Sequence, residues 1–384
     1  MSPRAAAAIG SEPDWDALAD QIVNRTLSVQ PGERVIYLVD PYVLPSLFEA
    51  VRLAVLRAGG IEHASTVNWT ERLTAVRDRE GKHPDPAAAL RENEAMLDLF
   101  RPAQVFIWLP ANYALRGSTT TMQSEWVLAR WPGRGLHFHW FPDVASGSGS
   151  EVTRRLYAAY QHAILDLDRA DLRARQERIV AAVRGRRLRV RTPDGTDLSV
   201  TLERNGWYHL NDGDASPEKV RNARCARDRE EELPAGAIRT LPIADSAEGT
   251  IRYRRGQGVA GRGVDLNAFT GDLELIFRAG HLVEANAGSR TDELRAAWDA
   301  QTGDKDRLSE IVIGSNPLLP LTIDGARMPV YWGFGAGGFR FHLGDIVESG
   351  GTFASSFSAE LWFTDATVEA DGVTIIRDGT LVIT

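Results

Sequence analysis

Residues 188–202 read Leu-Arg-Val-Arg-Thr-Pro-Asp-Gly-Thr-Asp-Leu-Ser-Val-Thr-Leu, and the pattern of the chain changes at this stretch. Apolar and polar residues alternate on both sides of Asp194-Gly195, a strong short-range signal for a β-hairpin. Before the stretch, apolar runs alternate with helical periodicity. After it, short strand patterns and turns dominate. We therefore predict two domains, spanning residues 1–185 and 186–384.

The first domain is predicted to be an α/β domain. Strand-like stretches at 35–39, 105–109 and 136–141 are interspersed with helical stretches at 45–58, 87–100 and 123–130. This alternation predicts an open, mostly parallel sheet flanked by helices. A long helical stretch at 151–183 follows, and we expect it to bridge the two domains.

The second domain is predicted to be β-rich and to carry a cleft. Glycine is dense at 256–280 and again at 333–351, and the last forty residues look like short strand pairs around Asp-Gly turns. Helical patterns are expected only at 291–302 and 305–311. The predicted fold class is therefore α/β followed by a β-rich domain.

Composition excludes several classes of protein. The net charge of −8 argues against general nucleic-acid binding. No apolar run approaches about 18 residues, so no membrane span is expected, and 1–10 lacks the pattern of a signal peptide. The single cysteine, Cys225, cannot form a disulfide within the chain and fits a cytoplasmic location. Its surroundings match no nucleophile motif.

Several segments, in order, resemble the thermophilic leucine aminopeptidase family, of the aminopeptidase T and S type. They are Gly-Thr-Asp-Leu at 195–198, Leu-Pro-Ala-Gly-Ala-Ile-Arg-Thr-Leu-Pro at 233–242, Leu-Ile-Phe-Arg-Ala-Gly-His-Leu-Val-Glu at 275–284, Leu-Ser-Glu-Ile-Val-Ile-Gly-Ser-Asn-Pro at 308–317, and Phe-His-Leu-Gly-Asp-Ile-Val at 341–347. No single motif is specific, and the five weak motifs in the right order are together fairly strong. The resemblance implies an aminopeptidase T-like fold and a homodimer.

The same resemblance implies a metal site with missing ligands. Such peptidases hold two divalent metals, which activate a bridging water. The family's ligand positions fall, in order, on Ala237, Glu310, Tyr331, His342 and Gly344. Glu310, His342 and the neighbouring Asp345 are therefore the candidate ligands, for one divalent ion (Fe, Mn or Zn) or for none. Asp345 is displaced by one residue, which reverses a strand side chain unless a bulge at Gly344 corrects it.

Aromatic residues near these positions are candidates for ligand binding. They are Trp207, His209, Tyr331, Trp332 and Phe334. The glycines between the last three either let a ligand approach the backbone or form a tightly packed corner. Both interpretations stay open at the level of sequence.

Three functions are compatible with this pattern. The first is a peptide-binding protein without ordinary peptidase activity, assisting cyclisation or modification of a ribosomal peptide in natural-product biosynthesis. The second is a one-metal enzyme acting on a small aromatic ring, since the scaffold is also similar to dihydroxypyridine dioxygenases and nitroanthranilate hydrolases. The third is an active metal-dependent aminopeptidase. A metal-free structural protein is a further alternative.

Overall fold

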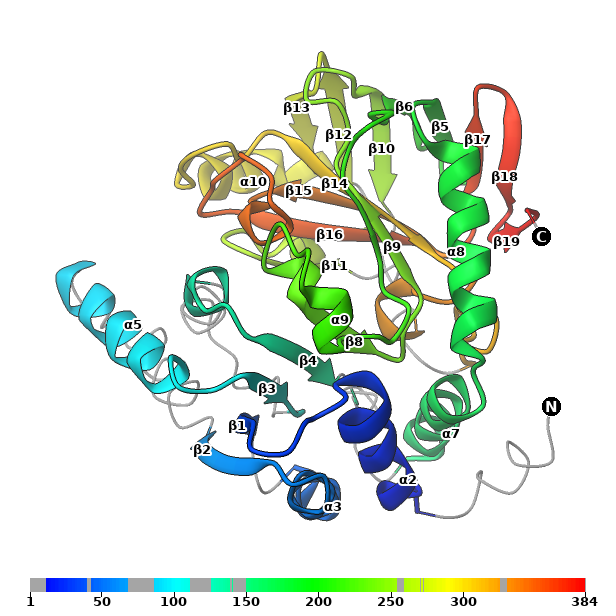
Figure 1. Cartoon of the computed structure of the whole chain (residues 1–384). Helices are drawn as coiled ribbons and strands as arrows, with labels where there is room; N and C mark the ends of the chain where they lie inside the picture. The colour runs from blue at the N-terminus through cyan, green and yellow to red at the C-terminus, as the bar shows by residue number, and fades with distance from the viewer. Residues whose placement is uncertain are drawn as a thin grey trace.

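The protein is described by a computed structural model that covers residues 12–39, 43–67, 86–110, 126–138, 140, 150–253, 259–269, 271, 273–324 and 330–383. Figure 1 shows an α/β unit, drawn below, and a β-rich unit above it. The expected fold class is thus confirmed.

The first unit is built on a parallel five-stranded sheet. In spatial order its strands are β2 (Ile61–Val67), β1 (Arg34–Val39), β3 (Val105–Trp108), β4 (Arg134–Phe138) and β8 (Glu230–Leu233). The helices of this unit are α2 (Trp15–Asp20), the π-helical η2 (Gln21–Thr26), α3 (Pro45–Arg57), α5 (Pro86–Phe100) and α7 (Glu151–Leu165). The central strands β1 and β3 are almost wholly apolar, as expected for a parallel sheet with both faces covered.

Strand β8 comes from beyond residue 185, yet it completes the first sheet. It pairs with β4 in parallel, Gly135 with Glu230 through Phe138 with Leu233. The chain therefore returns to the first unit after the β5–β6 hairpin. This return carries the acidic residues of β8 to the junction with the second unit.

The helical stretch expected at 151–183 is two helices, so the prediction of one continuous helix is wrong. Helix α7 ends at Leu165, and α8 spans Arg169–Val183. The Asp168 side chain accepts hydrogen bonds from the backbone N–H groups of Ala170 and Asp171, which begins a new helix. Figure 1 shows α8 rising from the first unit to β5.

The second unit contains two mostly antiparallel sheets. The eight-stranded sheet runs β13 (His281–Asn286), β12 (Leu273–Arg278), β10 (Glu248–Tyr253), β6 (Asp197–Thr201), β5 (Arg187–Arg191), β17 (Thr367–Ala370), β18 (Val373–Arg377) and β19 (Thr380–Leu381). The six-stranded sheet runs β11 (Val259–Arg262), β16 (Ser358–Phe363), β15 (Phe339–Gly344), β14 (Leu308–Gly314), β9 (Ala237–Thr240) and β7 (Tyr208–Leu210). The predicted hairpin is confirmed as β5–β6.

Short helices complete the second unit. They are α9 (Pro217–Val220), α10 (Thr291–Asp299), and the 3-10 turns η4 (Arg227–Arg229), η5 (Leu266–Phe269), η6 (Gly288–Arg290), η7 (Val330–Gly333) and η8 (Val347–Ser349). The helix expected at 291–302 is confirmed as α10. The helix expected at 305–311 is wrong, because β14 begins at Leu308 and pairs with both β15 and β9. Pairing on both sides outweighs the local helical pattern.

The two sheets of the second unit share one apolar core, to which both contribute buried side chains such as Leu198, Ile251, Ile311 and Phe341. The six-stranded sheet therefore buries one face in this core. Its other face meets the first unit, where Ala237 and Val312 join the core of that unit. In the part of the chain that the structure describes, no helix is long and apolar enough to cross a bilayer.

Candidate functional site

The second face of the six-stranded sheet carries a row of charged residues. Side chains alternate between faces along a strand, so the apolar neighbours of these residues point into the shared core. The charged members are Arg239 on β9, Glu310 on β14, Arg340 and His342 on β15, and Glu360 on β16. Glu310 pairs in register with His342, and His342 with Glu360.

These residues belong to a continuous series of ion pairs, which we call the charge chain. Its members, in order of contact, are Glu348, Arg227, Glu232, Arg239, Glu310, Arg340 and Glu360. Carboxylates and guanidiniums alternate throughout. The series runs from η8, through η4 and β8 next to the first unit, to β16 of the six-stranded sheet.

Glu310 lies at the centre of this arrangement and is fully buried. Its Oε2 accepts a hydrogen bond from Arg239 at 3.0 Å, and its Oε1 accepts one from the Ser349 hydroxyl at 2.9 Å. Arg340 Nη2 lies 3.5 Å from the same Oε2. Burial opposes ionisation, but the positive charges of Arg239 and Arg340 outweigh it and hold the pKa of Glu310 well below its usual range. Glu310 is therefore an anion with both oxygens engaged.

His342 and Arg340 are less completely bonded. His342 Nδ1 lies 3.9 Å from Glu310 Oε2, too far for a hydrogen bond. Among the described residues, neither ring nitrogen of His342 has a hydrogen-bond partner, and neither do Nε and Nη2 of Arg340. Both residues are more than nine-tenths buried. These atoms are the unsatisfied part of the site.

Phe334 joins the aromatic candidates to the charge chain. The guanidinium carbons of Arg239 and Arg340 lie 5.5 and 5.9 Å from the centre of its ring, within cation–π range. Tyr331 is also buried and meets Phe334 edge-on. The side chain of Trp332 lies outside the described residues.

The glycines of this region pack against backbone rather than leaving space. A Cβ at Gly338 would lie 2.0 Å from the carbonyl oxygen of Gly333, and one at Gly314 would lie 2.1 Å from that of Gly335. The structure therefore favours a tightly packed corner over a ligand-facing loop at these positions.

Trp207 and His209 form a second group beside Arg239, with which His209 pairs in register. Their rings stack, and Trp207 Nε1 donates to Asp228 at 2.8 Å. Burial lowers the pKa of His209, although Asp228 opposes the shift, so this imidazole is neutral. Burial and the nearby Asp228 raise the pKa of the Cys225 thiol to about 11, which argues against a nucleophilic thiolate.

Asp345 is directed to other partners. Strand β15 ends at Gly344, whose φ is +81°, and Asp345 follows it. Its carboxylate accepts from the backbone N–H of Ser355 at 3.0 Å and lies 3.3 Å from Arg262. Within the described part of the chain, no three His, Cys, Asp or Glu side chains lie together so that they could hold a metal ion. The structure thus brings Glu310 and His342 together and engages Asp345 elsewhere.

Glu230 extends the charge chain towards the first sheet. It lies 3.3 Å from Arg227 and 3.7 Å from His137 of β4. Burial raises the pKa of Glu230 to about 7, because the attraction of Arg227 only partly offsets it. This carboxyl group therefore gains and loses its proton near neutral pH.

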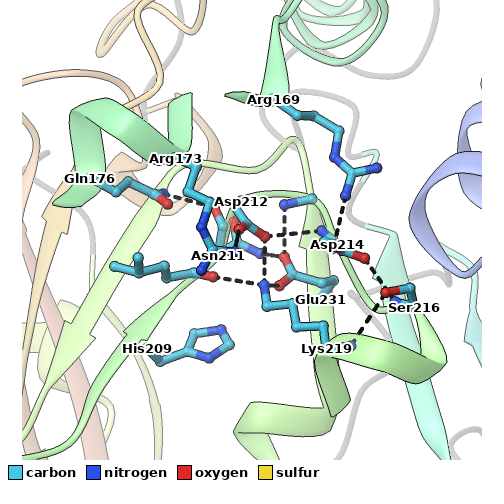
Figure 2. Close-up of polar contacts among 12 residues, drawn as sticks. Arg169, Arg173, Gln176, His209, Asn211, Asp212, Asp214, Ser216, Lys219 and Glu231 are labelled. Carbon is cyan, nitrogen blue, oxygen red and sulfur yellow. Dashed lines mark hydrogen bonds and ion pairs between the residues drawn. The ribbon is translucent and has the colours of Figure 1, made fainter. Parts of the chain in front are cut away.

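A separate polar network fixes α8 and α9 to β8. Figure 2 shows Lys219 directed at the carboxylates of Asp212 and Glu231, with Arg173 on the far side of Asp212. The Lys219 ammonium also donates to the Leu210 carbonyl at 3.0 Å, which uses its three N–H bonds. His209 lies beside this network with no dashed contact to it. The network holds the two units together, and the Lys219 ammonium has no N–H bond left for a ligand.

The arginines are the functional candidates that sequence reasoning missed. Arg239 and Arg340 stand in strands that are otherwise buried, as in Phe339-Arg-Phe-His-Leu. Arginine is almost never fully buried unless it is paired. An arginine within an otherwise apolar strand, on the same sheet face as a candidate ligand, was therefore the sequence signal for a buried ion pair.

The fold is similar to that of two solved structures. The chain aligns with wild-type AmpT from Thermus thermophilus at 19% identity and a TM-score of 0.66, covering 96% of this chain and 99% of that one. It aligns with 2,5-dihydroxypyridine dioxygenase from Pseudomonas putida KT2440 at 16% identity and a TM-score of 0.61, covering 96% and 97%. No family model matches the chain, and no curated protein is similar to it in sequence. The fold is therefore aminopeptidase T-like.

Proposed function

We propose that the protein binds a peptide on an aminopeptidase T-like fold without hydrolysing it. The observation that carries this proposal is the engagement of Glu310 by Arg239, Ser349 and Arg340. A metal ion needs ligand lone pairs that are not already directed at other cations. Glu310 does not meet that requirement.

The residues present do not fit the pair of metals that the fold implies. Ala237 has no ligating atom, and Asp345 is engaged by Arg262 and Ser355. Two guanidiniums next to Glu310 would also repel a divalent cation over a few ångströms. The proposed function therefore involves no metal ion.

Features that suit peptide binding support the rest of the proposal. The six-stranded sheet ends, among the described residues, at β7 and β11, and an extended peptide can add to such an edge through backbone hydrogen bonds. Assistance in the cyclisation or modification of a ribosomal peptide is the context we propose, in a cytoplasmic homodimer.

The test joins metal analysis with a cleavage assay. The metal content per chain is measured by mass spectrometry on protein purified without chelators, and on Glu310→Gln and His342→Gln as matched variants. Pooled tetrapeptides are then titrated by calorimetry with and without added Zn²⁺, Mn²⁺ and Fe²⁺, and are analysed for fragments. Saturable binding without fragments, and no metal that depends on Glu310, is the expected result. Metal-dependent cleavage abolished by Glu310→Gln would refute the proposal.

A second candidate is a one-metal enzyme acting on a small aromatic ring. The fold match to a dioxygenase and the register pairing of Glu310 with His342 favour it. It requires about one metal ion per chain that both variants remove. The same metal measurement therefore separates the two candidates.

A further inference from the structure

Four buried polar atoms on β15 have no hydrogen-bond partner among the described residues: Nε and Nη2 of Arg340, and Nδ1 and Nε2 of His342. A buried polar group left without a partner costs about 1–3 kcal/mol. Arg340 and His342 stand two residues apart on the same face of the strand. Arg340 Nη2 and His342 Nδ1 also lie near one atom, Glu310 Oε2, at 3.5 and 3.9 Å. The side chains that carry the unsatisfied atoms therefore lie together around Glu310 Oε2.

The surrounding charge argues against an anion at this place. The charge chain contains four carboxylates and three guanidiniums, so it already carries an excess negative charge. A further buried carboxylate would have no cation left to balance it, and such a charge costs several kcal/mol. An acidic ligand is therefore disfavoured.

The chemistry of the four atoms without hydrogen-bond partners argues against a cationic ligand. The Nε and Nη2 groups of Arg340 are donors only and cannot accept a hydrogen bond from an ammonium group. The group that suits these atoms is a neutral acceptor of hydrogen bonds.

We propose that Arg340 and His342 bind the carbonyl oxygen of a backbone amide, through the guanidinium and the imidazole N–H. This inference rests on the proposed function, because it names the part of the peptide that the site holds. Glu310 has a positioning role: its Oε2, which Arg239 fixes in turn, lies between the two side chains. Glu360, which is paired in register with His342, is 23% exposed, so solvent reaches the strand next to His342.

The experiment is a titration followed at the two side chains. Protein labelled with ¹⁵N in arginine and histidine is titrated with N-methylacetamide, a neutral model of the peptide group, and separately with acetate and with methylammonium. We expect N-methylacetamide to shift the Arg340 Nε–Hε signal and the His342 ring signals saturably, while the two ions leave them in place. No saturable shift with N-methylacetamide, or a larger shift with either ion, would overturn the inference.

Matched variants locate the binding. Arg340→Lys keeps the positive charge but removes Nε–H, and we expect it to weaken N-methylacetamide binding about tenfold, as loss of one or two hydrogen bonds implies. Arg189→Lys, on the exposed face of β5, serves as the control and should leave the affinity unchanged. Unchanged affinity in Arg340→Lys would overturn the inference. If that variant does not fold, the titration of the wild-type protein decides.

The two proposals fail in different ways. Metal-dependent cleavage of the tetrapeptides would refute the proposed function, whatever the N-methylacetamide titration shows. If the protein binds the tetrapeptides without cleaving them but N-methylacetamide causes no saturable shift, only the role of Arg340 and His342 is refuted.

Discussion

Replacing Arg239 with Met tests the charge chain most directly. Arg239 is 3% exposed and donates to two carboxylates, Glu232 and Glu310. Met keeps most of the length of the side chain but removes the charge and the donors, so both carboxylates lose a partner in a buried site. Removing one partner of a buried ion pair costs about 3–5 kcal/mol, while a whole domain is stable by about 5–15 kcal/mol. We expect a loss of about 3–5 kcal/mol in the free energy of unfolding at pH 7.

The penalty should also depend on pH, in a known direction. In the wild-type protein the pKa of Glu310 is held low, so its charge contributes stability that is present above the ordinary value of 4.5 and is lost as the pH falls. Without Arg239 the folded-state pKa rises, and protonation relieves the buried charge. The difference between variant and wild type should therefore be largest near pH 8 and smaller near pH 5.

Urea unfolding followed by tryptophan fluorescence at pH 8, 7, 6 and 5 measures both effects. The control is Arg189→Met, which removes an equally well-formed pair with Asp197 on the exposed face of β5. Exposed pairs contribute little, so this variant should unfold at the wild-type midpoint. The reasoning is refuted if Arg239→Met unfolds at the same midpoint as the control, or if its penalty is constant over the pH range.

Four further predictions follow from single sites. The pKa of Glu230 is raised from 4.5 to about 7 in the folded protein, so the folded state binds a proton that the unfolded state releases. The free energy of unfolding should therefore fall as the pH rises from 4.5 to 7. Glu230→Gln should flatten that fall in urea titrations. Lys219→Met should lower the unfolding free energy by about 3–5 kcal/mol, because buried Glu231 loses its cation and Asp212 keeps only Arg173. A loss no larger than that of an exposed ion pair would contradict this. Gly314→Ala should cost at least about 1–3 kcal/mol in thermal unfolding, because its Cβ would lie 2.1 Å from the Gly335 carbonyl oxygen. Cys225 should resist a thiol reagent at pH 8 until the protein is unfolded, since burial raises its pKa to about 11; rapid native labelling would show the thiol to be accessible.

Local sequence patterns predicted several elements of the first unit and the β5–β6 hairpin of the second. The hairpin around Asp194-Gly195, the helix at Pro45–Arg57 and the apolar strands of the first sheet depend on periodicity and turn chemistry within a few residues. The errors have a physical cause in each case. Asp168 begins a new helix by accepting backbone hydrogen bonds, and β14 is a strand because β9 and β15 both pair with it.

The candidate site was predictable only in part. Glu310 and His342 are paired in register and Phe334 lies against Arg340, but Asp345 is bonded to other residues. Arg239 and Arg340 were not foreseen, although both are more buried than His342. A charged residue within a strand pattern is visible in the sequence, but the residue with which it forms an ion pair is not.

The sequence by itself determined the fold class, the β5–β6 hairpin and the alternation of side chains between the two faces of a strand, because these depend on periods of two and 3.6 residues along the chain. Only the tertiary structure decided which charges meet. Glu348, Arg227 and Glu232 reach Arg239, Glu310, Arg340 and Glu360 through strand register and the return of β8 to the first sheet. A buried charge is stable only beside its opposite, and in this fold that opposite comes from another strand.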